Sequence, residues 1–465
     1  MRKTKSVLNT DSFDRRQYKE LYQMSQKLKE LEKKGKELLP SFPHLQGDIW
    51  ASFFKMNPEI RNDLAEDLIT NKMLMEKIMS NETYQKHRDS TKLDDLMSAI
   101  ACMTMADKTL KWINSMINTN HELQQSYQKM IGEMGGRQST QENRQKADEA
   151  KKDFEKNMKR VIQQEIDSFN SHITSAIEAA KETKQALKDM VSGLSPGSGK
   201  AELKKIPLRD KLTLAEKLSG NQKIREISHW TGRMKGIARK KQKTKHNQSI
   251  ERSGVGMGSM VERLLPSELA MYSHPATRLD FLRRFAEGQT MLYDPNGKET
   301  LGKGPIVLCL DQSGSMEHLD TQAKGFALAL MSIARKQRRD FALILFSTSA
   351  ITIKFAKGKI APNDMVELAT TFLNGGTNFY APLKQALDVI EESQFKKADL
   401  IFVTDGQASL PHAFVETFNE LKNERQFNVL SVLLGHRDMY TVKLFSDEIV
   451  TAESFLDASD TAFEI

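Results

Sequence analysis

Hydrophobic positions recur every three or four residues through the first part of the chain, which is the spacing of one helix face. One such stripe contains Leu93, Leu96, Ile100, Met103, Leu110, Ile113 and Ile117. A second stripe, between about residues 141 and 191, contains Phe154, Met158, Ile162, Phe169, Ile173, Ile177 and Leu187. The other faces of the second stripe are rich in Lys, Glu and Gln. The pattern predicts an α-helical N-terminal domain over residues 1–191, in which amphipathic helices pack on one another.

The pattern changes at about residue 305, where short apolar runs begin to alternate with stretches of helical length. The runs are PIVLCLD, FALILFS, AITIKF, DLIFVTD, NVLSVLLG and EIVTAE. Strands without polar alternation, separated by helices, are typical of a sheet that is covered on both faces. We therefore expect a doubly wound, Rossmann-like α/β domain over residues 301–465. Ligands of such domains bind at the carboxyl ends of the strands.

Residues 192–300 connect these two regions and have a mixed character. The segment SGLSPGSGKAEL (192–203) clusters Gly, Ser and Pro, as linkers do. It is not a phosphate loop, because Ala201 follows Lys200 where that loop needs Ser or Thr. The segment SGVGMGSM (253–260) has no strand before it, so we expect a bend or a loop in contact with backbone rather than a dinucleotide loop.

A basic run occupies residues 232–245 of the connecting region, with seven Lys and Arg residues and no acidic residue. Such a run attracts polyanions through counterion release. It is equally compatible with a solvated helix end or an exposed loop. Binding of lipid or nucleic acid through this run is kept as an alternative function, in which an anionic lipid surface is the candidate partner and nucleic acid is not an expected one.

Composition narrows the class of protein only modestly. The chain has 465 residues, 39% hydrophobic and 28% charged, with a net charge of +8. Cys102 and Cys309 lie in apolar stretches and are expected to be reduced core thiols of an intracellular protein. No apolar run approaches the ~18 residues of a membrane span, and the basic N-terminus lacks the apolar core of a signal peptide. We predict a cytoplasmic protein, with peripheral contact at the inner membrane face through the basic run as a further hypothesis.

Oxygen-bearing side chains follow two of the predicted strands and occupy one loop between them. The first strand ends in the sequence DQSGS, the strand DLIFVT is followed by Asp-Gly, and the loop LNGGTNFYAPL lies between them. The carboxyl ends of these strands should meet at one edge of the sheet. Carboxylates and hydroxyls are hard donors that suit Mg²⁺, which keeps several waters and needs few protein ligands. The candidate ligands are Asp311, Ser313, Ser315, Thr377 and Asp405.

This set resembles the metal-ion-dependent adhesion site of von Willebrand factor type A domains, which consists of Asp-x-Ser-x-Ser, a distant Thr and a distant Asp-Gly. The matching positions are Asp311, Ser313, Ser315, Thr377 and Asp405. The resemblance implies a bound Mg²⁺ or Mn²⁺ with one open position, which an acidic side chain of a partner protein fills. It also implies a binding module and not an enzyme.

The chain as a whole resembles the ViaA-like group, in which a long helical, charged N-terminal region precedes a von Willebrand factor type A domain. The stretches at residues 214–239 and 323–348 are similar to the middle segment and the post-motif helix of that group. This resemblance implies a MoxR-type AAA+ ATPase as the partner, with the chain as its adaptor or co-chaperone.

Two other hypotheses were weighed against the adaptor. A Mg²⁺-dependent phosphatase of the haloacid dehalogenase type needs a second Asp two residues after the first, and Ser313 stands there. A serine hydrolase needs Gly-x-Ser-x-Gly, and Asp311 stands where the first Gly should be. A Mg²⁺-dependent hydrolase is kept as an alternative, and polyanion binding through residues 232–245 is another.

Overall fold

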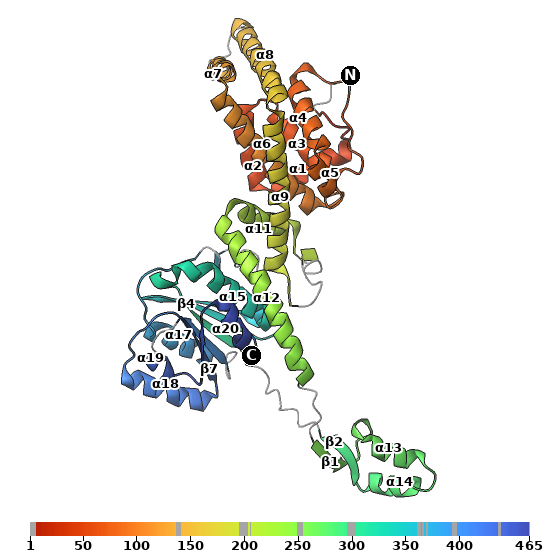
Figure 1. The fold of residues 1–465 in the computed structure, drawn as a ribbon, viewed down its shortest axis with the longest axis vertical. Coiled ribbons are helices and arrows are strands. Elements are labelled where there is room, and N and C mark those ends of the chain that lie inside the picture. The colour runs from red at the N-terminus through yellow and green to blue at the C-terminus, as the bar shows by residue number, and fades with distance from the viewer. Residues whose placement is uncertain are drawn as a thin grey trace. The chain divides into compact units, whose positions relative to one another are not determined.

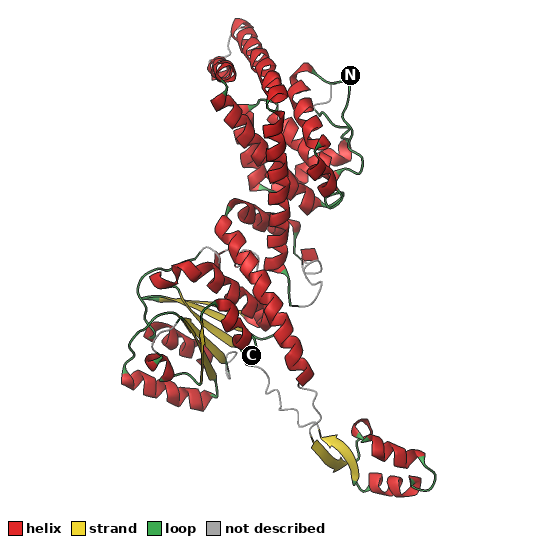
Figure 2. Ribbon diagram, viewed as in Figure 1, coloured by secondary structure: helices red, strands yellow, loops and turns green. Residues whose placement is uncertain are grey.

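The computed structural model describes most of the chain, and the chain divides into two compact units. The described residues are 6–135, 141–194, 203–204, 206–248, 254–294, 304–359, 364, 367–368, 371–392, 398–435 and 439–464. The first unit comprises Met1–Ser192, Gly199–Ser228 and Pro362–Ala369, and the second comprises Gly193–Ser198, His229–Ala361 and Thr370–Ile465. All named strands belong to the second unit (Figure 2). The predicted linker at residues 192–203 lies largely outside the described residues.

The first unit is a stack of helices around one apolar core (Figure 1). Its helices are α1 (Ser12–Met24), α2 (Gln26–Leu38), α3 (Phe42–Phe54), α4 (Ile69–Ser80), α5 (Glu82–Arg88), α6 (Asp95–Thr119), α7 (His121–Gly135), α8 (Gln141–Gln164), α9 (Ile166–Val191), α11 (Leu208–Gly220) and the first turns of α12 (Gln222–Gln248). The long helices α6 and α9 pack against each other, and the rings of Trp112 and Phe169 lie 4.7 Å apart between them. The helical fold predicted for this region is confirmed.

Both predicted apolar stripes face this core, with one exception. The members of the second stripe are all buried, and the stripe is divided between α8 and α9. Leu93 was wrongly included in the first stripe, because it is 61% exposed and has a left-handed backbone with φ of 54°. Helix α6 begins after Asp94, whose carboxylate caps it by accepting a hydrogen bond from the Met97 amide at 2.9 Å. The capping residue therefore sets the helix start, which the apolar spacing alone placed too early.

The second unit contains the predicted α/β domain. Its sheet has six strands in the order β5-β4-β3-β6-β7-β8, and every neighbouring pair is parallel except β4 and β5, which are antiparallel. The strands are β3 (Ile306–Asp311), β4 (Phe341–Phe346), β5 (Ala350–Phe355), β6 (Asp399–Thr404), β7 (Asn428–Leu434) and β8 (Glu448–Ala452). The helices are α15 (Asp320–Gln337), α17 (Tyr380–Glu391), α18 (His412–Arg425), α19 (Tyr440–Lys443) and α20 (Phe455–Ala462).

Helices cover both faces of this sheet, as the unbroken apolar runs predicted. Val307 and Cys309 of β3 pack with residues of α17 and α18 in one core cluster. Their neighbours along β3 point to the opposite face, where Phe326 of α15 contacts Phe455 and Phe463 at the C-terminal helix. Strands β3 and β4 are buried at every position, whereas the edge strands β5 and β8 are half exposed.

The order of the strands reverses at the carboxyl end of β3. The chain passes from β3 through α15 to β4 on one side, and β6 lies on the other side of β3. The strand order therefore reverses between β3 and β6, and ligands of open α/β sheets bind at the carboxyl ends of strands beside such a reversal.

A small module precedes the sheet in sequence and corrects one prediction. It consists of the antiparallel strands β1 (Gly254–Gly258) and β2 (Thr290–Asp294) and the helices α13 (Pro266–Ser273) and α14 (Arg278–Ala286). The glycine-rich segment at 253–260, expected to be a bend or loop, is largely strand β1. Pairing with β2 overrides the low strand propensity of glycine. A side chain at Gly258 would meet Leu292 Cδ1 at 2.6 Å, so the Leu292 side chain would have to shift to admit it.

Candidate metal centre

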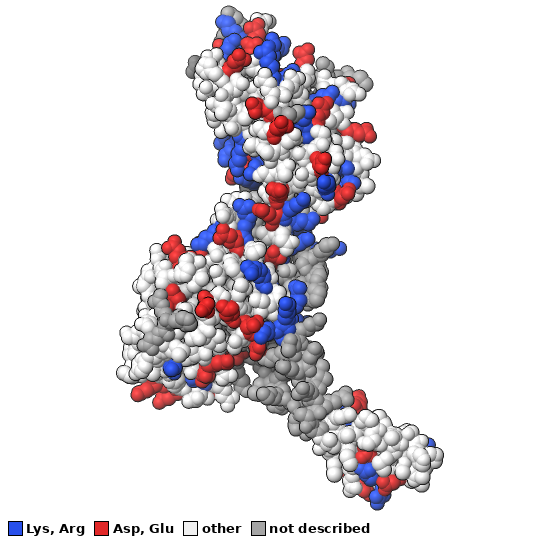
Figure 3. All heavy atoms as spheres, in the orientation of Figure 1, with Lys and Arg blue, Asp and Glu red and all other residues white. Residues whose placement is uncertain are grey.

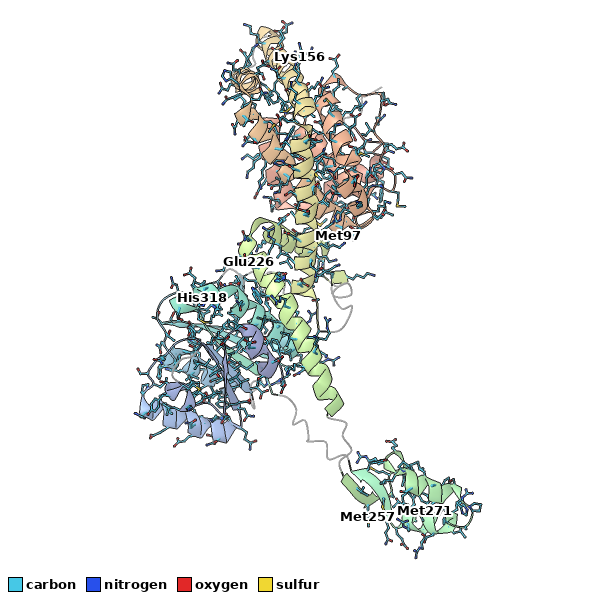
Figure 4. All side chains as sticks on the ribbon, viewed as in Figure 1. Met97, Lys156, Glu226, Met257, Met271 and His318 are labelled. Atoms are coloured by element: carbon cyan, nitrogen blue, oxygen red, sulfur yellow. The ribbon has the colours of Figure 1, made fainter. Side chains whose placement is uncertain are left out.

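The strand β3 carries Asp311 to this end of the sheet and the chain turns sharply behind it. The Gln312 amide donates a hydrogen bond to the Phe346 carbonyl at 2.7 Å, which continues the pairing with β4 by one step. The Asp311 Oδ1 atom then accepts a hydrogen bond from the Ser313 amide at 2.8 Å. A carboxylate that accepts from the amide two residues on forms an Asx turn. This turn leads into the short 3₁₀ helix Gly314–Leu319, which holds Ser315 and His318 (Figure 4).

Hydrogen bonds link Ser313 and Ser315 of this turn to Asp405, the second predicted carboxylate ligand. The hydroxyl oxygens of Ser313 and Ser315 lie 3.1 Å apart, and the Ser315 hydroxyl donates to Asp405 Oδ1 at 2.8 Å. Asp405 directly follows β6, which is hydrogen-bonded to β3. The parallel pairing of the two strands therefore brings together three of the predicted ligands from sequence positions 90 residues apart.

The loop that carries Thr377 lies at the same edge. The Gly314 amide donates to the Gly375 carbonyl at 2.9 Å, and the Asn378 amide donates to the Ser347 carbonyl at 2.9 Å. Gly375 has a φ of +110°, a conformation that L side chains rarely adopt, so this turn of the loop requires glycine. Thr377 itself packs against Gly406, where an added Cβ would lie 3.0 Å from the Thr377 hydroxyl oxygen.

Thr404 completes the cluster and was not found from the sequence. Its hydroxyl donates to Asp311 Oδ2 at 2.5 Å and accepts from the Gly406 amide at 3.0 Å. The signal in the sequence was its position directly before Asp405, at the end of the buried strand β6. With Ser313 on one oxygen and Thr404 on the other, both carboxylate oxygens of Asp311 are held in place.

Burial makes the electrostatics of this cluster unusual. Asp311 is fully buried, and Ser313 and Asp405 are almost fully buried, whereas Ser315 is exposed and Thr377 is half-buried. Loss of hydration raises the pKa of Asp311, hydrogen bonds from Thr404 and Ser313 lower it, and the nearby Asp405 raises it again. The groups that act on this pKa are neutral donors and a second carboxylate. A divalent cation would supply the positive charge that these groups lack.

The donor set of this cluster consists of oxygen atoms. Within the residues that the structure describes, no group of three or more His, Cys, Asp or Glu side chains could hold a metal ion. The site instead combines two carboxylates with hydroxyls, and oxygen ligands of this kind suit Mg²⁺ or Mn²⁺. Asp311, Ser313, Ser315, Thr377 and Asp405 would hold the ion, and Thr404 would orient Asp311.

The described residues of this cluster do not pair a serine nucleophile with a histidine base, and His436 lies outside the described residues. The hydroxyls of Ser313 and Ser315 are hydrogen-bonded to each other and to Asp405, not to a histidine. His318 and His412 are exposed side chains. A serine nucleophile needs an adjacent base that is itself oriented by a third group.

Comparisons with known proteins agree with this fold. A family model described as von Willebrand factor type A domain matches residues 306–407. The protein MJ0811 of Methanocaldococcus jannaschii is 29% identical over 461 residues, which cover 97% of each chain. MJ0077 of the same organism is 32% identical over 279 residues, 59% of this chain and 70% of its own length. The regulatory protein ViaA of Proteus mirabilis is 26% identical over 215 residues, 42% of this chain and 44% of ViaA.

This chain belongs to the ViaA-like group of von Willebrand factor type A domain proteins. The alignment with ViaA covers less than half of either protein, whereas that with MJ0811 covers nearly all of both. Among solved structures, proximal thread matrix protein 1 from the mussel byssus, with a zinc-occupied MIDAS motif, is 17% identical with a TM-score of 0.28. That match covers 35% of this chain and 46% of the mussel protein, and it concerns the fold alone.

The basic run of this ViaA-like protein lies on α12, and part of it is engaged within the second unit. Arg239 donates to the Leu194 carbonyl at 2.7 Å, and Lys241 pairs with Glu464 at 3.1 Å and with Asp460 at 3.8 Å. The side chains of residues 242–248 lie outside the described part. Among the described residues, no helix is long and apolar enough to cross a membrane.

Proposed function

We propose that this protein is a non-catalytic adaptor that binds a partner protein through a metal ion. Mg²⁺, or Mn²⁺, would be held by Asp311, Ser313, Ser315, Thr377 and Asp405, and a carboxylate of the partner would complete its coordination. We further propose a MoxR-type AAA+ ATPase as the partner, by resemblance to the ViaA-like group. This partnership would operate in the cytoplasm, with the basic run of α12 as a candidate contact to the inner membrane face.

One observation carries the metal proposal. The chain of hydrogen bonds from Ser313 through Ser315 to Asp405 joins the ends of β3 and β6, and the buried Asp311 lies at its base. A protein that used these groups only for packing would leave two carboxylates close together in a buried site at an energetic cost. A cation held by both carboxylates would offset that cost, and the exposed Ser315 leaves the cluster accessible to solvent.

The chemistry of the cluster supports binding over catalysis. A bound divalent ion would act here as a Lewis acid that accepts an oxygen ligand. The described side chains around it are hydrogen-bonded to one another, and none of them is paired as a nucleophile with a base. Relatives of this chain are named regulatory proteins, which agrees with an adaptor role.

Titration calorimetry with MgCl₂ and MnCl₂ tests the metal site directly. We expect Asp311→Ala to weaken ion binding by more than about tenfold, because losing even an outer partner of a metal ligand costs 10 to 100-fold. Asp388→Ala is the matched control, since Asp388 is an exposed carboxylate on α17 of the same unit. Equal ion binding by both variants and the unaltered protein would refute the site.

Binding to a purified MoxR-type ATPase tests the partner separately. We expect EDTA and Asp311→Ala each to reduce the amount of ATPase retained, while Asp388→Ala retains the normal amount. If Asp311→Ala abolishes ion binding but the ATPase is still retained, the metal does not mediate this contact. Hydrolysis of a model phosphate ester that depends on Asp311 would instead support the hydrolase alternative.

A further inference from the structure

Exposed apolar side chains are concentrated in the small module formed by β1, β2, α13 and α14. Among the described residues, the large hydrophobic side chains that are well exposed number sixteen, and nine of them lie between residues 255 and 291. The nine are Val255, Met257, Met260, Val261, Leu269, Tyr272, Leu279, Leu282 and Met291. In Figure 3 most atoms of this module belong to neither charge class. An apolar concentration of this kind marks an interaction surface.

The two faces of the β1–β2 hairpin differ sharply. On one face, Leu292 packs with Leu264 and Phe281 in the small core of the module. The residues on the other face alternate with it, and there Met257 is paired across the strands with Met291. Met257 is 77% exposed and Met291 is 42% exposed, so the helices of the module leave this face uncovered. Met257 is labelled in Figure 4.

The two edges of the hairpin also differ. The outer edge of β2 is occupied, because the Leu265 amide donates to the Met291 carbonyl at 3.1 Å and the Met291 amide donates to Glu268 Oε1 at 3.1 Å. Strand β1 pairs with β2 alone within the described residues, so its other edge presents backbone amides and carbonyls without a strand beside them. Natural edge strands are commonly protected by charged residues, proline or a bulge. Strand β1, with the sequence GVGMG, has none of these charges or prolines.

We propose that β1 pairs with β1 of a second copy of this chain, antiparallel and centred on Gly256. In this register Val255 lies opposite Met257 of the partner, and glycines lie opposite glycines. The spacing of two between Val255 and Met257 keeps all four apolar side chains on the same face of the resulting four-stranded sheet. A two-fold arrangement makes the same patch serve both copies.

The sequence of β1 favours a second copy over an unrelated strand. In this register Gly256 lies opposite its own copy, and Val255 and Met257 lie diagonal to theirs, so a charge at any of these positions would lie near a like charge. Strand β1 carries no charge, and Met260 and Val261, which follow the exposed Ser259, are exposed and apolar. The proposal does not depend on the metal site, which lies on other strands of the protein.

Disulfide cross-linking of the full-length protein tests the register. Val255→Cys and Met257→Cys are made separately, and the two variants are oxidised singly and as an equimolar mixture. Residues directly opposite have Cβ atoms about 4.5–5.5 Å apart, whereas diagonal neighbours are about 7–8 Å apart. We expect the mixture to give several-fold more cross-linked dimer than either variant alone. Cys102 and Cys309 are fully buried and do not compete.

A matched pair of exposed positions serves as the control. Leu279→Cys and Leu282→Cys lie on α14 of the same module and are also exposed, but they are outside the proposed seam. Their mixture should give no more dimer than the single variants. Equal cross-linking in all mixtures and single variants would overturn the register.

Light scattering during size exclusion tests the association itself and needs no cysteine. We expect the unaltered protein to show a dimer fraction that increases with concentration, and Met257→Glu to reduce this fraction at least tenfold by placing charge in the seam. Leu279→Glu should leave the fraction unchanged. A protein that stays monomeric at about 100 µM, or one whose Met257→Cys forms disulfides only with a partner of another sequence, would refute pairing with a second copy.

Discussion

The hydroxyl of Ser315 lies 2.8 Å from a carboxylate oxygen of Asp405, although 90 residues separate them in the sequence. The contact exists because β3 and β6 are parallel neighbours and both end at the same edge of the sheet. It joins the two halves of the candidate metal centre. Two of the predictions below concern this site, and two concern packing elsewhere in the chain.

Removing the Ser315 hydroxyl should eliminate the hydrogen bond between the two halves of the site without disturbing the fold. We expect Ser315→Ala to weaken Mg²⁺ binding by about 10 to 100-fold, because the ion loses a ligand and Asp405 loses its hydrogen bond. Thermal unfolding should change little, since Ser315 is exposed. Titration calorimetry measures the affinity. Ser409→Ala, an exposed serine in the loop after β6, is the control, and an equal loss in both variants would contradict a specific role.

Thr404 should matter for both stability and metal affinity. Thr404→Val keeps the shape of the side chain but leaves Asp311 Oδ2 and the Gly406 amide without their present partner. We expect a loss of about 1–3 kcal/mol in the free energy of unfolding, together with weaker Mg²⁺ binding. Urea unfolding and calorimetry measure the two effects. A Thr404→Ser variant retains the hydroxyl and should recover the metal affinity; if it does not, orientation of Asp311 by this hydroxyl is not the cause.

The helical unit should become less stable in mild acid because of His87. This side chain is 4% exposed, and burial, together with the nearby Lys181 and Lys184, lowers its pKa to about 4. Unfolded chain binds a proton near pH 6.5, whereas the folded unit does not, so stability is present above pH 6.5 and is lost as the pH falls towards 4. At pH 5 this loss amounts to about 2 kcal/mol for an unfolded pKa near 6.5.

Urea unfolding at pH 7 and pH 5 measures this effect in the unaltered protein and in His87→Gln. The difference between the two pH values should be smaller in His87→Gln, because glutamine does not titrate. His121→Gln, a surface position at the start of α7, should retain the full difference. An unchanged pH dependence in His87→Gln would assign the acid sensitivity to other groups.

Replacing either of two helical glycines in the second unit with alanine should change the stability of the protein, but in opposite directions. A Cβ at Gly325 of α15 would lie 2.7 Å from the Trp230 Cβ and 3.1 Å from the backbone of Thr231, so α12 and α15 would have to move apart. We expect Gly325→Ala to destabilise by about 1–3 kcal/mol. A Cβ at Gly236 of α12 meets nothing within 4 Å, so Gly236→Ala should stabilise by about 0.5–1 kcal/mol through helix propensity. Thermal unfolding of both variants measures the contrast, and equal behaviour would contradict the close helix contact.

Much of the fold follows from the local pattern of hydrophobic residues in the sequence. The stripes that include Ile113 and Phe169 predicted helices that pack on one another, and both residues are buried in the core of the first unit. The unbroken apolar runs predicted strands covered on both faces, and β3 is buried at every position. Leu93 is an exception. Its spacing fits the apolar stripe, but Asp94 caps the helix, so the helix begins only after Leu93.

The candidate site was also predicted in outline but not in its contacts. Asp311, Ser313, Ser315, Thr377 and Asp405 were proposed from the motif, and the structure brings their segments to one edge. Thr404 was missed because its role depends on facing Asp311 across two strands that are 93 residues apart in the sequence.

The sequence by itself determined most of the helices and the strands of the large sheet, because hydrophobic periodicity and capping act within a few residues. It also determined which chemical groups stand at the ends of β3 and β6. Only the tertiary structure decided which of these groups touch, that β1 is a strand with an open edge, and that Arg239 and Lys241 are engaged within the second unit. These outcomes depend on strand order and on packing between distant segments, since a hydrogen bond or an ion pair forms only where the whole fold places its two partners within about 3 Å.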